Sequence, residues 1–276
     1  MLRRMEEEAI APPQRDRPEF VAALARGLAV IEVFSAQTPE LSLSEVAELT
    51  HMSPATARRA LLTLQELGYV GLTGKRFVLR PKVLSLGAAF LGAMNIRELV
   101  QPYLQEIADR SRDAASLAVL EGENVLYVAH VPNSRRIRFN ASVGYRAPAF
   151  CTALGRVLWA YLSPEDIEDK LSRAPFPFYT GRTVTQADAL RDVLAQVREQ
   201  GYASQSEQLD YDVVSIAVPI RDSVGRVIAA INCSSELSRN DLDTLISTRL
   251  QPLRDTARQI EEGLQRFPAL AHAMTP

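Results

Sequence analysis

The sequence predicts an α+β protein built from a winged helix-turn-helix, a linking helix and a larger domain with a mostly antiparallel sheet. Three observations predict it: three short helical apolar stripes end in a hairpin signal, a helix rich in small residues follows, and strands then bracket helices as far as a long closing helix. The chain has 276 residues, 47% of them hydrophobic, which suits two domains with separate cores.

Composition excludes several classes of protein. The formal net charge of −2 argues against a histone-like binder, although DNA recognition needs only a local basic patch. No apolar run approaches the roughly 18 residues of a membrane span, and no secretory signal is present. Cys151 and Cys233 form no metal-binding spacing, so we expect a cytoplasmic protein without metal or cofactor.

The predicted DNA-binding domain occupies residues 18–81, after an N-terminal arm, residues 1–17, that we expect to be flexible. Apolar residues at helical spacing predict a first helix that ends near Ser35. A breaker at 37–40 precedes a second helix that starts at Ser42 or Ser44. A tight turn at 51–52 then leads into the third helix.

The third helix and the wing have clear boundaries. Ser53 is a good N-cap, and Pro54 suits the first helical position because its missing N–H would be unpaired there. Gly68 ends the helix. Strand-like runs at 69–72 and 76–79 then surround a glycine turn, which predicts a hairpin closed by a proline.

Positive charge gathers on the third helix and the wing. Six basic residues lie between positions 58 and 82, against a single acid, Glu66. Arginine can bond bidentately to guanine, and a helix N-terminus attracts phosphate. The alternative is that Arg58 and Arg59 only solvate a helix face. We expect DNA contacts from Arg26, Ser53, Ala55, Thr56, Arg58, Arg59, Thr63, Lys75 and Arg76.

Residues 82–96 predict a linking helix rich in leucine, glycine and alanine. Small residues allow close helix approach, which favours dimer contacts here, but a helix lying on its own domain fits the periodicity equally well. Residues 97–265 form the predicted second domain, and 266–276 a C-terminal tail. The expected helices of this second domain are 97–111, 152–162, 164–172, 187–200 and 239–265. Its expected strands are 115–121, 124–130, 136–143, 202–207, 214–220 and 226–234.

Several segments carry recognisable motifs: 24–30, 43–47, 54–64 and 67–70 in the first domain, and the runs CTALGRVL at 151–158 and SIAVPI at 215–220. Together these segments resemble the IclR family of regulators. Residues 176–185 resemble a branch that regulates protocatechuate, 4-hydroxybenzoate and β-ketoadipate catabolism. The resemblance implies a dimer or dimer of dimers, a palindromic double-stranded operator, and a GAF-like effector domain.

In this family the start of one helix and three strand positions line the effector pocket. Gln205 stands where members that bind 2-oxo acids carry an acid, and Ser215 and Asn232 also differ from those members, which favours another ligand. An aromatic carboxylate needs an apolar slot, polar donors and a partner for its charge. We expect effector contacts from Arg136, Phe139, Thr152, Ala153, Leu154, Gln205, Ser215, Asn232 and Ser234.

The expected function is therefore allosteric transcription regulation: a small organic acid from aromatic catabolism changes operator binding or promoter activation. Alternatives are a regulator of a 2-oxo acid and a DNA-binding protein whose second domain only oligomerises. An enzyme is disfavoured, because three scattered histidines and two cysteines form no catalytic motif. For Trp159 and both cysteines, burial in a core is the simpler interpretation. For Arg135 and Arg138 the simpler interpretation is that their charged side chains face the solvent.

Overall fold

The computed structural model describes residues 19–35, 38–93, 96–132 and 141–274. It divides into two compact units, with the boundary between Phe90 and Leu91. The N-terminal unit has one buried apolar cluster and the C-terminal unit has two, one on each face of its sheet. The predicted boundaries at 18, 81 and 96 stay predictions, because a compact unit and a functional domain need not end at the same residue.

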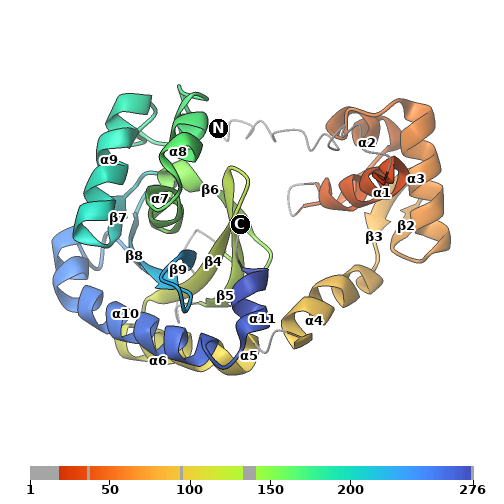
Figure 1. The fold of residues 1–276 in the computed structure, drawn as a ribbon. Helices are drawn as coiled ribbons and strands as arrows, with labels where there is room; N and C mark the ends of the chain where they lie inside the picture. Colours follow the sequence, from red (N-terminus) through yellow and green to blue (C-terminus); the bar gives the residue numbers. More distant parts are fainter. Residues whose placement is uncertain (1–18, 36–37, 94–95, 133–140, 275–276) are drawn as a thin grey trace. The chain divides into compact units, whose positions relative to one another are not determined.

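The N-terminal unit combines helices with a small antiparallel sheet whose strand order is β1-β3-β2 (Figure 1). Its elements are α1 (Ala22–Glu32), β1 (Glu40–Leu41), α2 (Leu43–Leu49), α3 (Pro54–Glu66), β2 (Val70–Thr73) and β3 (Arg76–Leu79). The helices enclose a core that includes Val30, Val46 and Leu61, each fully buried. This core places the polar face of α3 outside.

Local sequence fixes the ends of α2 and α3. Ser42 and Glu45 form a reciprocal capping box, in which the Ser42 N–H donates to the Glu45 carboxylate at 2.7 Å. This hydrogen bond is the main reason that the pKa of Glu45 lies below its usual value. Ser53 caps α3 through the Thr56 N–H at 3.3 Å. The helix begins at Pro54 as the sequence predicts, and Gly68 follows it with φ +82°.

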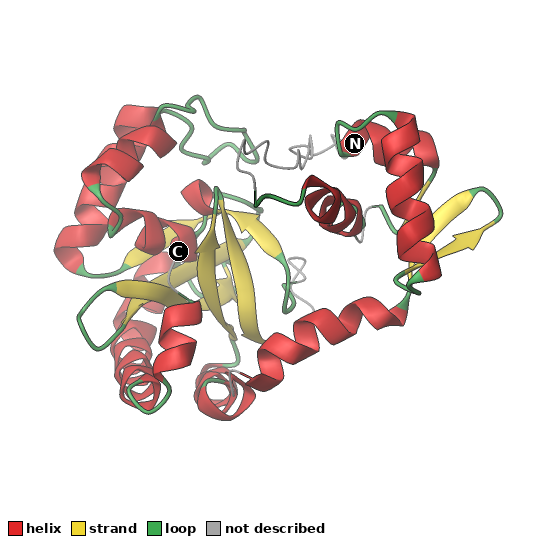
Figure 2. Cartoon of the chain, turned by 45° about the vertical axis from the view of Figure 1, so that its right-hand side comes forward, coloured by secondary structure: helices red, strands yellow, loops and turns green. Residues whose placement is uncertain are grey.

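The wing is the hairpin of β2 and β3, turning at Gly74 with φ +64° (Figure 2). The structure adds a strand that the sequence analysis did not predict: Glu40 and Leu41 pair with Val78 and Phe77 of β3. Two residues carry no readable alternation, so periodicity could not reveal this strand.

The linking segment is shorter as an α-helix than predicted. A 3-10 turn, η1 (Pro81–Val83), comes first, and α4 (Leu84–Ala93) then continues across the boundary between the units. Leu84 and Leu86 lie exposed on α4.

The C-terminal unit is built on one six-stranded antiparallel sheet with the order β6-β5-β4-β9-β8-β7. Its strands are β4 (Ala114–Glu121), β5 (Asn124–Val131), β6 (Arg146–Pro148), β7 (Ala203–Ser206), β8 (Val213–Arg221) and β9 (Val227–Glu236). Its helices are α5 (Ile96–Leu99), α6 (Gln101–Ser111), η2 (Ala149–Cys151), α7 (Ala153–Ala160), α8 (Pro164–Leu171), α9 (Ala187–Gln200), α10 (Leu242–Leu264) and α11 (Pro268–Ala273).

Helices cover both faces of this sheet (Figure 1). On one face α10 packs against alternate residues of β8, such as Ile216 and Val218, while α6 packs against β4 and β5. On the other face α7 packs against β8 and β9, with α9 beyond it. The central strands are therefore buried on both sides, and small polar residues on the α7 face are enclosed rather than exposed.

Two details differ from the sequence prediction. Residues 141–143, the described end of the strand expected at 136–143, are not a strand, and the edge strand is β6 at Arg146–Pro148. The helix expected from residue 97 is divided in two at Val100, which precedes α6. Pro102, in the first turn of α6, lacks the N–H that a continuous helix would pair with the Glu98 carbonyl, so the hydrogen-bond ladder is interrupted there.

Candidate DNA-binding surface and ligand cavity

The exposed face of α3 carries the expected DNA-contacting side chains. Arg58, Arg59 and Thr63 are exposed, whereas Ala57, Leu61 and Leu64 of the same helix are buried. Thr63 donates its hydroxyl to the Arg59 carbonyl at 3.0 Å. The two guanidinium groups are therefore presented outward by a helix that is anchored on its opposite side.

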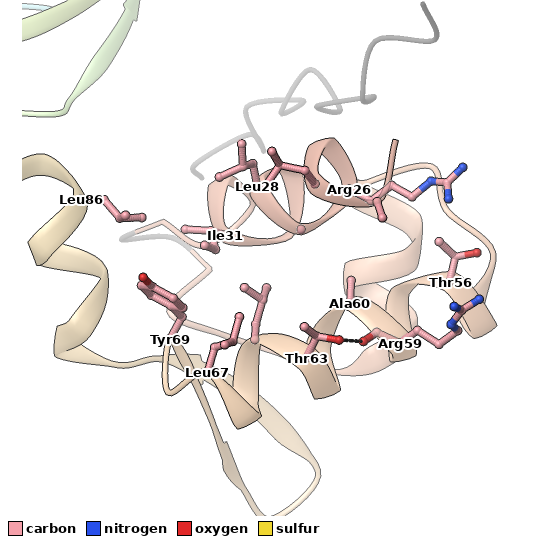
Figure 3. A pocket seen from close by; sticks show the side chains of 14 residues that line it. Arg26, Leu28, Ile31, Thr56, Arg59, Ala60, Thr63, Leu67, Tyr69 and Leu86 are labelled. Carbon is pink, nitrogen blue, oxygen red and sulfur yellow. Dashed lines mark hydrogen bonds between the residues drawn. The ribbon is translucent and has the colours of Figure 1, made fainter. Parts of the chain in front are cut away.

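A groove of about 470 Å³ lies between α1, α3 and the start of α4. Figure 3 shows Arg26, Thr56 and Arg59 together at one end, while Tyr69 and Leu86 lie at the other. The groove thus has a cationic end beside the start of α3 and an apolar end. Leu28, on the α1 wall, is 48% exposed.

The two wing cations differ in their surroundings. Lys75 is exposed at the turn. The Arg76 guanidinium instead pairs with Glu40 at 3.0 Å and with Glu45 at 3.2 Å. Its charge is already neutralised by carboxylates from β1 and α2. A role of Arg76 in DNA contact stays a prediction, and these pairs count against it.

A small cavity lies on the α7 face of the large sheet. Six residues that the sequence analysis proposed for effector contact line it: Thr152, Ala153, Gln205, Ser215, Asn232 and Ser234. They come from the start of α7 and from β7, β8 and β9, and the register places Ser215 opposite both Gln205 and Ser234. The sheet therefore gathers residues that are distant in sequence.

The other three expected effector residues lie elsewhere. Leu154 is 1% exposed and packs in the core beneath α7, outside the cavity lining. Arg136 and Phe139, like Arg135 and Arg138, lie outside the described residues. Sequence reasoning missed four lining residues: Tyr127, Leu209, Asp210 and Val213. Alternation on the predicted strand at 124–130 offered a weak signal for Tyr127, but nothing singled out Asp210 in its loop.

A buried arginine is linked to the cavity lining through hydrogen bonds. Arg156 of α7 is 3% exposed; its Nε donates to the Phe150 carbonyl at 3.0 Å and its Nη2 to Gln208 Oε1 at 2.7 Å. Burial lowers the pKa of Arg156 to about 10. The Gln208 N–H in turn donates to Gln205 Oε1 at 3.0 Å, which fixes the amide of a cavity residue.

Both cysteines are fully buried, and burial raises the pKa of the Cys151 thiol to about 12. Trp159 is 1% exposed, so the simpler interpretation of all three residues is confirmed. Within the described ranges, no three metal-ligating side chains converge. Each described helix is too short or too polar to cross a membrane.

A winged helix-turn-helix followed by a separate α+β domain defines the class of DNA-binding transcription regulators. Two family models match this chain: the IclR helix-turn-helix domain at residues 23–72, and the bacterial transcriptional regulator IclR C-terminal domain at residues 88–262. The chain belongs to the IclR family of bacterial transcriptional regulators. Its partner is therefore DNA, and it is a regulator rather than an enzyme.

Characterised relatives of this chain are also transcription regulators. The Pca regulon regulatory protein of Pseudomonas putida is 40% identical over 223 residues, which are 80% of this chain and 77% of that protein. The p-hydroxybenzoate hydroxylase transcriptional activator of Acinetobacter baylyi is 30% identical over 247 residues, covering 88% and 91%. These names fit the aromatic-catabolism branch of the family.

A solved structure has the same fold. The crystal structure of an IclR homolog from Microbacterium hydrocarbonoxydans, complexed with 4-hydroxybenzoate, is 26% identical to this chain. It covers 88% of this chain and 99% of its own, with a TM-score of 0.74. The predicted α+β fold with a winged helix-turn-helix and a GAF-like domain is confirmed at this level.

Proposed function

We propose that this regulator binds an aromatic carboxylate from aromatic catabolism in the cavity at the start of α7. Binding changes the affinity of the protein for an operator or its activation of a promoter. The observation that carries the proposal is the convergence of six expected effector residues around one cavity. The 4-hydroxybenzoate complex of the Microbacterium homolog supports the ligand class.

The cavity measures only about 30 Å³, whereas pockets for small ligands usually measure about 300–1,000 Å³. An aromatic acid therefore enters only when a wall moves. The wall formed by Leu209 and Asp210 belongs to the loop between β7 and β8, and it is partly exposed. Glu207 and Asp212 bound this loop with φ +53° and +63°, conformations that residues other than glycine seldom adopt.

Regulation requires the acid to prefer one state of the protein, since equal affinity for two states shifts neither. We propose α4 as the transmitter, because its helix continues from one compact unit into the other. The cytoplasm is the compartment in which such a protein meets both a bacterial operator and a catabolic intermediate.

The test is calorimetric titration of the full chain with 4-hydroxybenzoate, protocatechuate, β-ketoadipate and 2-oxo acids, together with a mobility-shift assay on the DNA upstream of its own gene. An aromatic acid that binds and changes the shift supports the proposal. If only 2-oxo acids bind, the ligand is a 2-oxo acid and not an aromatic carboxylate. Heat from none of them would favour a second domain that only oligomerises.

We also propose that the chain acts as a homodimer, or a dimer of dimers, on a palindromic operator. The apolar end of the α1–α3 groove, with half-exposed Leu28 on its wall, supports a second copy as its occupant.

Leu28→Glu should weaken self-association at least about tenfold, because it places a charge in an apolar contact. Sedimentation velocity measures the effect. Val224→Glu changes a more exposed residue in the β8–β9 turn and serves as the control. Equal association of both variants would remove this face from the dimer proposal.

A further inference from the structure

Asn232, which lines the cavity, leaves a buried hydrogen-bond acceptor unused. Its side chain is 5% exposed. The amide nitrogen donates to Ser234 Oγ at 2.9 Å and to Ser215 Oγ at 3.3 Å, so both of its protons are engaged. The amide oxygen, Oδ1, is buried and has no hydrogen-bond partner among the described residues.

The hydroxyl protons of Ser234, Ser215 and Thr152 are directed to other acceptors. Ser234 donates to Ser215 Oγ at 2.9 Å, and Ser215 donates to the Cys233 carbonyl at 3.3 Å. Thr152 donates to the Pro148 carbonyl at 3.2 Å. None of these three hydroxyls satisfies Asn232 Oδ1. Besides this acceptor, the lining includes the carboxylate of Asp210, the hydroxyl of Tyr127 and the amide of Gln205.

An unsatisfied buried acceptor costs free energy, and a ligand that brings a donor recovers it. A matching place for an anion lies at the start of α7. The Gly155 N–H is capped by Thr152 Oγ1 at 3.1 Å, whereas the N–H groups of Ala153 and Leu154, in the same turn, have no intrahelical acceptor. Ala153 lines the cavity.

We propose that Asn232 is a specificity-determining residue: its Oδ1 accepts a hydrogen bond from a hydroxyl group of the ligand, while the ligand's carboxylate lies at the first turn of α7. The cavity thereby selects a hydroxylated acid over the same acid without the hydroxyl. This inference rests on the proposed ligand class and adds the chemical group that is recognised.

The direction of the amide decides the preference. If the amide were reversed, its NH2 group would face the cavity and a ligand acceptor, such as a methoxy or oxo oxygen, would bind best. Hydroxyl and methoxy analogues of one acid therefore distinguish the two orientations, because a methoxy group accepts hydrogen bonds but donates none.

The experiment is calorimetric titration of the full chain with benzoate and with the hydroxy- and methoxybenzoates substituted at positions 3 and 4. We expect at least one hydroxybenzoate to bind about 10-fold or more tighter than benzoate and than its methoxy partner. Asn232→Ala should reduce that ratio to below about threefold, with tighter relative binding of benzoate.

The matched control is Ser235→Ala. Ser235 is the neighbouring buried polar residue of β9, on the opposite sheet face, where its Oγ accepts from Asn240 at 2.9 Å. This variant should keep the full ratio. Circular dichroism and thermal melting confirm that both variants fold, and Asn232→Ser gives a second, smaller replacement if the alanine variant does not.

Three outcomes overturn the inference. Equal binding of benzoate and both hydroxybenzoates to the unmodified protein would reject hydroxyl selection but leave aromatic-acid binding intact. If a methoxybenzoate binds more tightly than the matching hydroxybenzoate, the Asn232 amide has the opposite orientation and its NH2 group faces the ligand. An unchanged ratio in the Asn232 variants would assign the selection to another residue. If none of the five acids binds, the inference fails, and the titration with protocatechuate described above decides whether the proposed ligand class fails as well.

Discussion

The two units of this protein present their recognition residues in opposite ways. The N-terminal unit uses one helix, and its arginines stand exposed on consecutive positions of α3. The C-terminal unit draws its polar residues from α7, β7, β8 and β9, and encloses them. On the proposed function, DNA would bind a surface that already exists, whereas a small acid would have to enter an interior. The two units should therefore respond differently to the same kinds of substitution.

The largest expected effect is in the enclosed unit. In Gly155→Ala the new Cβ would lie 2.2 Å from the Cα and carbonyl oxygen of Ala149, which are backbone atoms that cannot turn aside. We expect the free energy of unfolding of the C-terminal unit to fall by roughly 3 kcal/mol, the upper part of the usual range for overpacking. Urea denaturation measures it.

Gly181→Ala is the control for this prediction, because a Cβ there meets nothing within 4 Å. If the two variants have similar free energies of unfolding, η2 and α7 can move apart without loss of stability. The C-terminal unit would then be less tightly packed than its contacts indicate.

The next effect concerns the exposed surface. Arg59→Ala should weaken operator binding about 10- to 100-fold while leaving stability unchanged, because the side chain is exposed and packs against no core. Fluorescence anisotropy on operator and random duplexes measures it. Arg110→Ala removes the same charge from an exposed ion pair on α6 and should change neither quantity. Unchanged DNA affinity in Arg59→Ala would remove it from the contact surface.

A smaller effect separates the two wing cations. Lys75→Ala should lower DNA affinity and reduce the dependence of log affinity on log salt by about one contact. Arg76→Ala should change affinity less than about threefold, because Glu40 and Glu45 already pair with the guanidinium. Salt-dependent anisotropy titrations compare them. A larger loss in the Arg76 variant would show that this arginine leaves its carboxylates to meet phosphate.

The smallest effect is a pH dependence in the enclosed unit. Burial lowers the pKa of His130 from 6.5, and its Nδ1 lies 3.0 Å from Ser116 Oγ. The unfolded chain therefore takes up the proton first, so this contribution to stability is complete above about pH 6.5 and declines as the pH falls below it. His130→Gln should flatten the melting temperature between pH 7.5 and 5.5. Parallel curves for the two proteins would contradict this.

The same contrast explains what the sequence could predict. The bounds of α3, its cap at Ser53 and the glycine turn of the wing depend on neighbouring residues, and the structure agrees with them. The shared cavity was reachable only through family resemblance, because Thr152 and Asn232 lie 80 positions apart and are brought together only when α7 packs on β9. Asp210 stands in an irregular loop, where no periodicity exists to single it out.

The near-closed cavity has a consequence for how such a regulator would respond in a cell. If only about 1% of molecules hold the loop wall open, the measured affinity for an acid is about 100-fold weaker than the affinity of the open form. The concentration at which the gene responds is then set by the loop as much as by the lining. Substitutions at Glu207 or Asp212, whose backbones are held in an uncommon conformation, could retune that threshold without altering which acid is recognised.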